Sequence, residues 1–228
     1  MPTPPPSSEP APDPQALGPC SPPPGLAPRR PLAHAIGPSG AAWLDRADRE
    51  RTEPRERILD ALRVGPGDAV ADVGAGTGYY TVALAQRVGP QGRVVATDLH
   101  PEMLRKLEAK ARRAGLRNVE TRLATEADTK LPRSAFDLVL LVDVYHELAR
   151  PFEALAQIRC ALKEGGRLAL LEYRAEDAEL AIRPEHKMSA EDVTAEVEPV
   201  GFRLGERLEF LPQHHIFVFV QAKPRAPG

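Results

Sequence analysis

Apolar runs alternate with helical patterns along residues 40–222 of this chain. Runs at 70–73, 92–98 and 136–142, and the strand that follows a glycine turn within 162–173, are rich in Val, Leu and Ala. Continuous apolar runs of this kind are typical of parallel strands buried on both faces of a sheet. Between them, apolar side chains at three- and four-residue spacing indicate helices with one buried face. The predicted helices are 53–62, 81–88, 101–115 and 151–162.

Three further segments complete the predicted sheet. Residues 118–124 alternate between apolar and polar side chains, as a strand near the edge of a sheet does. Residues 201–211 and 215–220 predict two strands joined by a short turn that contains a proline. The chain therefore predicts an α/β fold with a doubly wound, mostly parallel sheet, helices on both faces and a hairpin at its end.

A glycine-rich turn follows the first strand and carries the most specific pattern in the chain. Asp72 is followed by Gly74, Gly76 and Gly78 at two-residue spacing. Glycine permits positive φ and lets the backbone approach a ligand closely. A dinucleotide-binding turn needs a small residue where this chain has Tyr79, and no Gly-Lys-Ser/Thr phosphate loop is present. The pattern instead resembles motif I of class I S-adenosylmethionine (SAM)-dependent methyltransferases.

The segments downstream extend this resemblance over about residues 40–222. Asp98 ends the second strand about twenty residues on, where a carboxylate can accept both ribose hydroxyls. The resemblance implies a seven-stranded Rossmann-like sheet with an antiparallel final strand, and S-adenosyl-L-methionine as cofactor. It also implies transfer of the methyl group by in-line displacement to a nucleophilic atom.

The resemblance also implies where the cofactor binds. Backbone N–H groups of the glycine turn would face the SAM carboxylate, Asp72 would lie near the methionine end, and Asp98 would bind the ribose. The adenine position falls in 124–128, where Ala-Thr-Glu-Ala-Asp replaces the commoner Gly-Asp pair. The cofactor-binding residues implied in this way are Asp72, Gly74, Gly76, Gly78, Tyr79, Asp98, Leu99, Thr125, Glu126 and Asp143.

The richest polar cluster is Asp143-Val-Tyr145-His146-Glu147, directly after a buried strand. His146 resembles the histidine that many small-molecule methyltransferases hold near the cofactor, and a histidine can take a proton from a nucleophile near neutral pH. The other candidate catalytic residues are Tyr145, in the same cluster, and Glu172, at the end of the next strand. The alternatives are that His146 orients the following helix and that Glu172 is a solvated loop acid. His186 falls in 175–198, which is either a variable substrate segment or surface.

Proline content divides the chain into three parts. Residues 1–38 hold 14 of the 25 prolines and predict a disordered tail, because such a segment buries too little apolar surface to offset its ordering entropy. Residues 39–222 predict one methyltransferase domain with an N-terminal helical lid, and 223–228 a disordered C-terminus. Cys20 and Cys160 suggest no disulfide framework and are interpreted as free thiols in a reducing cytoplasm.

Composition limits the partners. The formal net charge is only -2, the cationic helix at 101–115 is interleaved with acids, and no apolar stretch reaches the length of a membrane span. No His-Glu-x-x-His or Cys-x-x-Cys spacing is present, so no metal is expected. We expect a cytoplasmic monomer or homodimer that methylates a small molecule and binds neither nucleic acid nor membrane. The alternatives are a protein or RNA methyltransferase that docks through the Pro-rich tail, and a non-catalytic SAM-binding protein.

Overall fold

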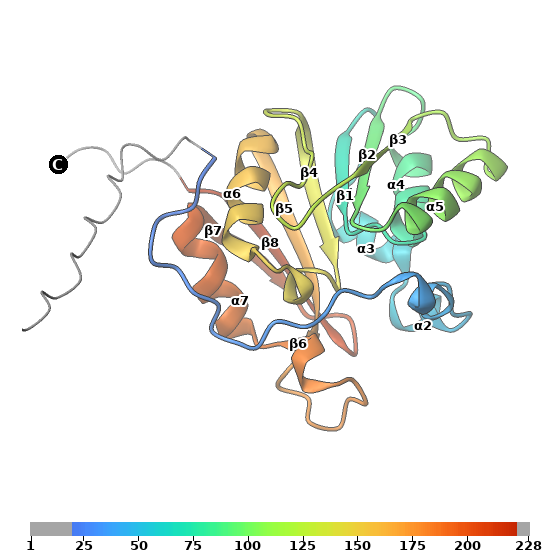
Figure 1. The fold of residues 1–228 in the computed structure, drawn as a ribbon. Helices are drawn as coiled ribbons and strands as arrows, with labels where there is room; N and C mark the ends of the chain where they lie inside the picture. The colour runs from blue at the N-terminus through green and yellow to red at the C-terminus, as the bar shows by residue number, and fades with distance from the viewer. Residues whose placement is uncertain (1–19, 223–228) are drawn as a thin grey trace, which may run out of the picture.

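The computed structural model describes residues 20–222 (Figure 1). Most of the described chain after residue 40 forms alternating strands and helices. The strands are β1 (Ala69–Val73), β2 (Arg93–Asp98), β3 (Val119–Leu123), β4 (Phe136–Val142), β5 (Leu162–Arg174), β6 (Lys187–Met188), β7 (Phe202–Leu208) and β8 (His214–Gln221). The α-helices are α1 (Ala41–Leu44), α2 (Arg49–Thr52), α3 (Arg55–Ala61), α4 (Tyr79–Val88), α5 (Pro101–Arg113), α6 (Pro151–Ala161) and α7 (Ala190–Val197). Short 3-10 turns are η1 (Pro38–Gly40), η2 (Tyr145–Glu147), η3 (Pro184–His186) and η4 (Glu198–Val200).

The strands form one twisted sheet in the order β3-β2-β1-β4-β5-β8-β7. The pairs among β1 to β5 are parallel, whereas β8 runs antiparallel to both β5 and β7. This order confirms the predicted doubly wound, mostly parallel sheet with an antiparallel final strand. The sequence did not predict β6, a two-residue strand that pairs with the end of β5.

Helices cover both faces of the sheet, as Figure 1 shows. Alternate residues of β1 separate the two cores: Val70 packs with Ile58 of α3 and Leu84 of α4, while Ala71 belongs to the core that contains α6 and α7. The apolar run in each central strand is continuous because both faces of the strand are covered.

Successive strands are added on one side of β1 up to β3 and on its other side from β4 onward, so the strand order reverses between β1 and β4, the point at which parallel α/β sheets bind their ligands. The glycine turn follows β1 and Asp143 follows β4, so the sheet brings both to one edge.

The described part of the N-terminal tail, residues 20–38, runs along the outside of α7 and η2 to the sheet edge (Figure 1). We call residues 20–37 the strap. Arg30 donates hydrogen bonds to the carbonyls of Tyr145 and His146 at 3.1 and 3.0 Å, and lies 3.5 Å from buried Glu196. These contacts give the segment polar partners that its composition alone does not reveal. The remainder of the predicted tail, and residues 223–228, lie outside the described residues.

The interpretation of both cysteines as free thiols was wrong. A disulfide joins Cys20, at the start of the strap, to Cys160 in α6, across 140 residues of sequence. The sequence could not indicate this pair, because the strap brings its first residue back onto the helix only through tertiary contacts.

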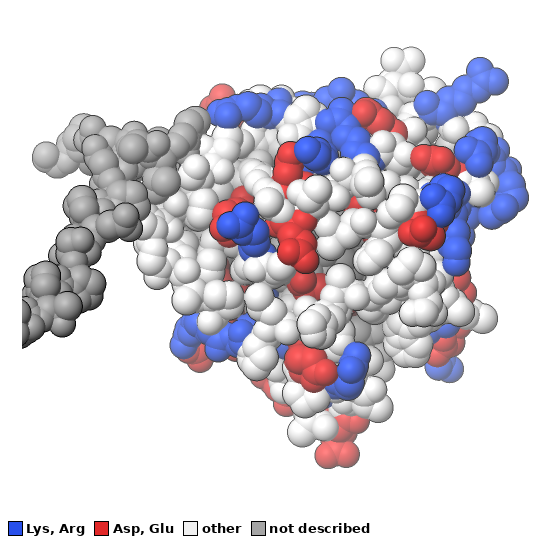
Figure 2. All heavy atoms as spheres, viewed as in Figure 1, with Lys and Arg blue, Asp and Glu red and all other residues white. Residues whose placement is uncertain are grey.

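The surface carries mixed charge. On the face in Figure 2, Lys and Arg side chains are interspersed with Asp and Glu rather than gathered in a single track. No helix within residues 20–222 is long and apolar enough to cross a bilayer.

Candidate active site

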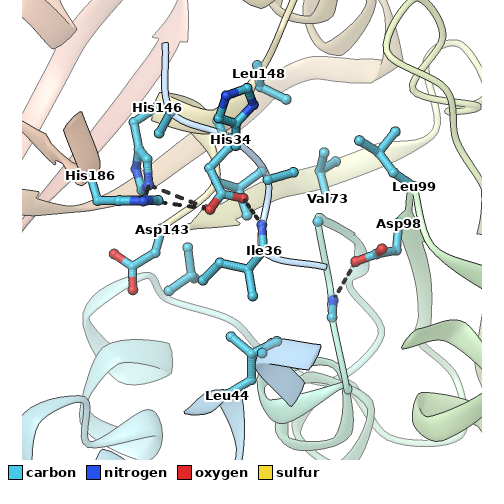
Figure 3. A pocket seen from close by; sticks show the side chains of 18 of the residues that line it. His34, Ile36, Leu44, Val73, Asp98, Leu99, Asp143, His146, Leu148 and His186 are labelled. Carbon is cyan, nitrogen blue, oxygen red and sulfur yellow. Dashed lines mark hydrogen bonds and ion pairs between the residues drawn. The ribbon is translucent and has the colours of Figure 1, made fainter. Parts of the chain in front are cut away.

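A cavity of about 780 Å³ lies at the carboxyl ends of β1, β2 and β4 (Figure 3). The strap residues Leu32–Ile36 and the lid residues Trp43 and Leu44 line it opposite the sheet edge. Its size is within the roughly 300–1,000 Å³ range of small-molecule sites. The cavity contains these residues from the sequence-based prediction: Gly74, Gly76, Asp98, Leu99, Thr125, Glu126, Asp143 and His146.

The glycine turn keeps one wall of the cavity free of side chains. Gly74 has φ 70°, and a Cβ there would lie 2.5 Å from Val144. Gly76 has φ 53°, and its Cβ would lie 2.7 Å from Leu44. Both positions therefore require glycine for conformation as well as for space. Gly78 is different, because it approaches Leu107 of α5 and does not line the cavity.

Asp98 is held in one orientation at the end of β2. Its carboxylate, labelled in Figure 3, accepts a hydrogen bond from the backbone N–H of Gly76 at 2.9 Å. It also accepts one from the backbone N–H of His100 at 2.8 Å. Each oxygen keeps further acceptor capacity, since a carboxylate oxygen has two lone pairs. The exposed side chain of Leu99 follows directly. Thr125 and Glu126 lie at the exposed rim, where Thr125 closes a tight turn with Asp128.

Asp72 and Tyr79 lie beside the cavity rather than in it. They line a small adjoining hollow that shares Arg49, Gly74 and Gly76 with the main cavity. Asp72 is buried and accepts a hydrogen bond from Thr81 at 2.5 Å. Burial raises the pKa of Asp72 to about 6, against the opposing effects of the Thr81 bond and the Arg49 charge.

Arg49 joins the two hollows and was missed by sequence reasoning. Its Nε donates to Glu53 at 2.9 Å and its guanidinium also donates to the carbonyl of Leu44, so these bonds hold the lid segment together. The same guanidinium lies 4.2 Å from the ring centre of Tyr79, directly after the glycine turn. Burial alone would lower the pKa of Arg49, but the Glu53 carboxylate raises it above its ordinary value. The residue escaped notice because 45–57 is so rich in charge that it resembles a solvated face.

Asp143 lies at the start of the polar cluster in a left-handed conformation, with φ 54°. Non-glycine residues in this region are strained and concentrate at functional sites. His214 from β8 approaches it at 3.2 Å. Burial opposes ionisation of Asp143, but the positive charges of His214 and Arg49 hold its pKa below the usual value.

His146 forms a buried pair with Glu172. The Nδ1 atom of His146 lies 2.5 Å from Glu172, which also accepts the backbone N–H of Tyr145 at 2.9 Å. The carboxylate can only accept, so Nδ1 carries the proton, and in neutral His146 the electron pair lies on Nε2, which is hydrogen-bonded to Nδ1 of His186 at 3.0 Å. Burial alone would lower the pKa of His146, but the Glu172 charge and hydrogen bond raise it.

Tyr145 and Glu172 do not face the cavity. The hydroxyl of Tyr145 donates to Glu196 of α7 at 3.0 Å, and both Tyr145 and Glu172 are fully buried. The tight turn η2 sends consecutive side chains in different directions, so only His146 and Glu147 of this turn reach the cavity. Tyr145 and Glu172 can position His146, but they cannot touch a substrate in this arrangement.

Comparison with known proteins gives the family. The family model of a methyltransferase domain matches residues 65–209, which is more than half of the chain. This chain belongs to the class I SAM-dependent methyltransferase family.

Relatives within this family include methyltransferases of small molecules. The chain is 34% identical over 120 residues to the ubiquinone/menaquinone biosynthesis C-methyltransferase UbiE of Hydrogenovibrio crunogenus, covering 52% of this chain and 47% of the relative. It is 41% identical over 83 residues to the nocamycin O-methyltransferase of Saccharothrix syringae, covering 36% of this chain and 30% of the relative. The chain thus spans half or less of the length of these curated relatives.

A solved structure extends the similarity over the whole domain. The SAM-dependent methyltransferase from Aquifex aeolicus superposes with a TM-score of 0.76 at 28% identity, covering 81% of this chain and 98% of that one. The sequence-based resemblance to class I methyltransferases, and the cofactor that it implies, are therefore confirmed.

The methyltransferase site fits S-adenosylmethionine by its own geometry. The backbone of Gly74 and Gly76 itself lines the cavity, which lets a ligand approach the main chain closely, and the Asp98 carboxylate is fixed at the end of the neighbouring strand. The apolar side chain of Leu99 stands next to it at the cavity wall.

Two cavity residues beside His146 were missed as site residues. Glu147 was named only as part of the polar cluster, and His186 was left between substrate segment and surface. Each lies within hydrogen-bonding or ion-pair distance of His146, although His186 is 40 residues away in sequence. The available signal was the position of 175–198 directly after β5, where a loop returns to the ligand edge of the sheet.

Proposed function

We propose that this chain transfers the methyl group of SAM to a small acceptor that carries an ionisable hydroxyl, at the oxygen or at a carbon activated by it. The observation that carries the proposal is the buried His146–Glu172 pair, whose histidine lines the same cavity as the glycine turn and Asp98. When bound, S-adenosylmethionine supplies an electrophilic methyl group on a sulfonium sulfur.

The cofactor side of the cavity would be formed by residues that are already fixed. Gly74 and Gly76 allow close approach of the ligand, Asp98 accepts hydroxyl hydrogen bonds, and Leu99 supplies apolar contact. Asp143, bound to His214 across the site, presents a negative charge. Because these groups are preorganised, positioning would supply much of the acceleration, which for well-oriented reactants amounts to about 7–11 kcal/mol.

His146 would take the proton of the acceptor. Its Nδ1 is committed to Glu172, so the proton from the acceptor hydroxyl goes to Nε2 and the resulting imidazolium is stabilised by the carboxylate. A positioned base of this kind contributes roughly 10²–10⁴-fold in rate. Glu172 and Tyr145 are positioning residues in this proposal.

The acceptor class follows from chemistry that the named relatives share. One is a C-methyltransferase and another an O-methyltransferase by name. A phenol or enol serves both outcomes, because loss of its proton raises electron density on the oxygen and on the carbon next to the one that bears the oxygen. On the face shown in Figure 2 the charges are mixed, which supports a small acceptor over RNA at this face, since nucleic-acid sites gather Lys and Arg. Cytoplasmic location and a monomeric or homodimeric state remain predictions.

The test begins with calorimetric binding of SAM and S-adenosylhomocysteine to the full chain, with Asp98→Ala beside it. We expect binding by the wild type and at least a tenfold loss in Asp98→Ala. A panel of phenols and enols is then incubated with methyl-labelled SAM and scored for label in the acceptor. SAM binding without transfer to any acceptor would favour a non-catalytic SAM-binding protein, and transfer to tRNA or protein alone would overturn the small-acceptor assignment.

A further inference from the structure

Three donor atoms converge on the acceptor side of the cavity. The Nε2 atom of His146 and the Nδ1 atom of His186 are 3.0 Å apart, and Glu147 Oε1 lies 3.9 Å from the first and 3.8 Å from the second. Figure 3 shows the two histidines turned toward one another. All three side chains line the cavity.

The spacing of these atoms matches a metal-binding site. A cation at the centre of the three atoms would lie about 2.1 Å from each, close to the roughly 2.0–2.2 Å bonds that Zn²⁺ forms with histidine nitrogen and carboxylate oxygen. This point lies in the plane of the three atoms, so a tetrahedral site, whose ligands are about 3.4 Å apart, requires small side-chain rotations. Two histidines and one carboxylate with open positions are a frequent ligand set for divalent transition metals.

Glu147 provides an independent sign that a ligand is accommodated. Its side chain is only 9% exposed. One oxygen accepts the backbone N–H of Ile36 at 3.2 Å, whereas Oε1, which faces the histidines, has no hydrogen-bond partner. A buried carboxylate oxygen without a partner is costly, and a bound cation would satisfy it.

Glu172 completes the arrangement behind His146. Metal-bound histidines usually donate the other ring N–H to a carboxylate, which fixes the tautomer and makes the ligand nitrogen more basic. His146 has this partner at its Nδ1, and a buried one.

A competing hydrogen bond has to yield on binding. Arg183 donates to Nε2 of His186 at 3.1 Å, which places the proton of neutral His186 on Nδ1. In this tautomer Nδ1–H of His186 donates to Nε2 of His146 at 3.0 Å. A cation between the two histidines requires the other tautomer of His186, replaces that hydrogen bond and displaces the arginine. The Arg183 side chain is 75% exposed, so it can turn into solvent at little cost.

The other His and acid cluster in the described residues, made of Glu53, Asp143 and His214, lacks this character. The Arg49 guanidinium already lies 2.9 Å from Glu53 and would repel a cation.

We propose that His146, Glu147 and His186 bind one divalent transition-metal cation such as Zn²⁺, with coordination positions open to the cavity. Its role in catalysis rests on the proposed function, but cation binding does not. An acceptor hydroxyl bound to the cation would lose its proton to water more readily. The resulting oxyanion would then be the nucleophile. In the cation-bound state the Nε2 pair of His146 is a ligand, so water replaces His146 as the final proton acceptor.

The test is calorimetric titration of the chelator-treated full chain with ZnCl₂, with SAM titrated separately into each variant. We expect one Zn²⁺ per chain, at least tenfold weaker binding in His186→Ala and in Glu147→Gln, and unchanged zinc binding in the control His100→Ala. His100 also lines the cavity, but it lies beside Asp98. Arg183→Ala should bind zinc more tightly than the wild type, because it removes both the competing donor and a positive charge.

The SAM titration separates the two proposals. If the wild type binds SAM but binds zinc no more tightly than His186→Ala does, the cation site is refuted and the proposed function stands. Zinc uptake at the expected site without SAM binding overturns the proposed function alone. Equal zinc binding by wild type, His186→Ala and Glu147→Gln would place the metal elsewhere and refute the assignment.

Discussion

Buried carboxyl groups give this site its electrostatic character. Burial raises the pKa of Asp72 to about 6 and the pKa of Glu147 to about 7, with only partial compensation by neighbouring positive charge. Burial opposes ionisation of Asp143 as well, but the positive charges of His214 and Arg49 outweigh it and lower the pKa of Asp143. Neighbouring acids in one site therefore ionise in different pH ranges.

The Asp72 carboxyl should make stability depend on pH. Between its unfolded value of 3.8 and the folded value of about 6, the folded chain keeps a proton that the unfolded chain has lost. Below pH 3.8 this carboxyl therefore does not lower the free energy of unfolding, and as pH rises from 3.8 to about 6 the free energy of unfolding falls. We expect the free energy of unfolding of Asp72→Asn to exceed that of wild type by about 2–3 kcal/mol at about pH 7.5, and the difference to vanish near pH 4. Urea unfolding at both pH values measures it, and a difference that does not change with pH would contradict the assignment.

The Nε2 atom of His146 faces the acceptor side whether it acts as base or ligand. We therefore expect His146→Ala to lower kcat by roughly 10²–10⁴-fold, because it removes the group that assists loss of the acceptor proton. SAM affinity should change by less than about threefold, since the cofactor side of the cavity is untouched. Stopped assays with labelled SAM and calorimetry give the two quantities. A kcat within about threefold of wild type would exclude His146 from the chemical step.

At the scale of elements, the strap and the turn η2 support each other. The N–H of Ala33 donates to the carbonyl of His146 at 3.1 Å, and Arg30 bonds the carbonyls of Tyr145 and His146. The strap thus forms part of the cavity wall and also fixes the backbone that carries His146. The hydrogen bonds of Arg30 therefore hold both the strap in the cavity wall and the backbone that carries His146.

Arg30→Ala should loosen this part of the wall. The substitution leaves Glu196, whose side chain is only 1% exposed, without its positive partner, and frees the backbone of the strap. We expect faster amide hydrogen exchange at Ala33 and Ile36 and a higher KM for the acceptor. Arg29→Ala is the matched control, because the Arg29 side chain is 49% exposed and contacts only exposed or half-exposed acids. Equal exchange in both variants would mean that Arg30 does not hold the strap.

At the scale of the whole molecule, the disulfide ties the strap to α6 and closes a loop of 140 residues. Cross-links that close long loops restrict the unfolded chain and typically stabilise by about 2–4 kcal/mol. We expect Cys20→Ser and Cys160→Ser each to lose about this amount, and the double variant to lose no more than either single one. Thermal unfolding under oxidising conditions measures this, and additive losses would show that the two sulfurs are not joined.

Sequence pattern determined the fold and one half of the site. Apolar runs predicted the central strands because strands buried on both faces carry mostly apolar side chains. Asp72, Gly74, Gly76 and Asp98 could be located because their spacing is local: a strand, its turn and the next strand end follow one another within about thirty residues. The conformations of Gly74 and Gly76 agree with that prediction, since each has positive φ.

Only the tertiary structure decided the acceptor half of the site. His186 reaches His146 from 40 residues away, and Cys20 reaches Cys160 from 140 residues away. Arg49 faces the cavity because Glu53 neutralises it in the fold, although its sequence surroundings resemble a solvated helix. Tyr145 and Glu172 belong to the right strand ends, but rotation within η2 and full burial turn them away from the cavity. Local spacing encodes where a strand ends, whereas side-chain direction and contacts between distant segments arise only when the layers pack together.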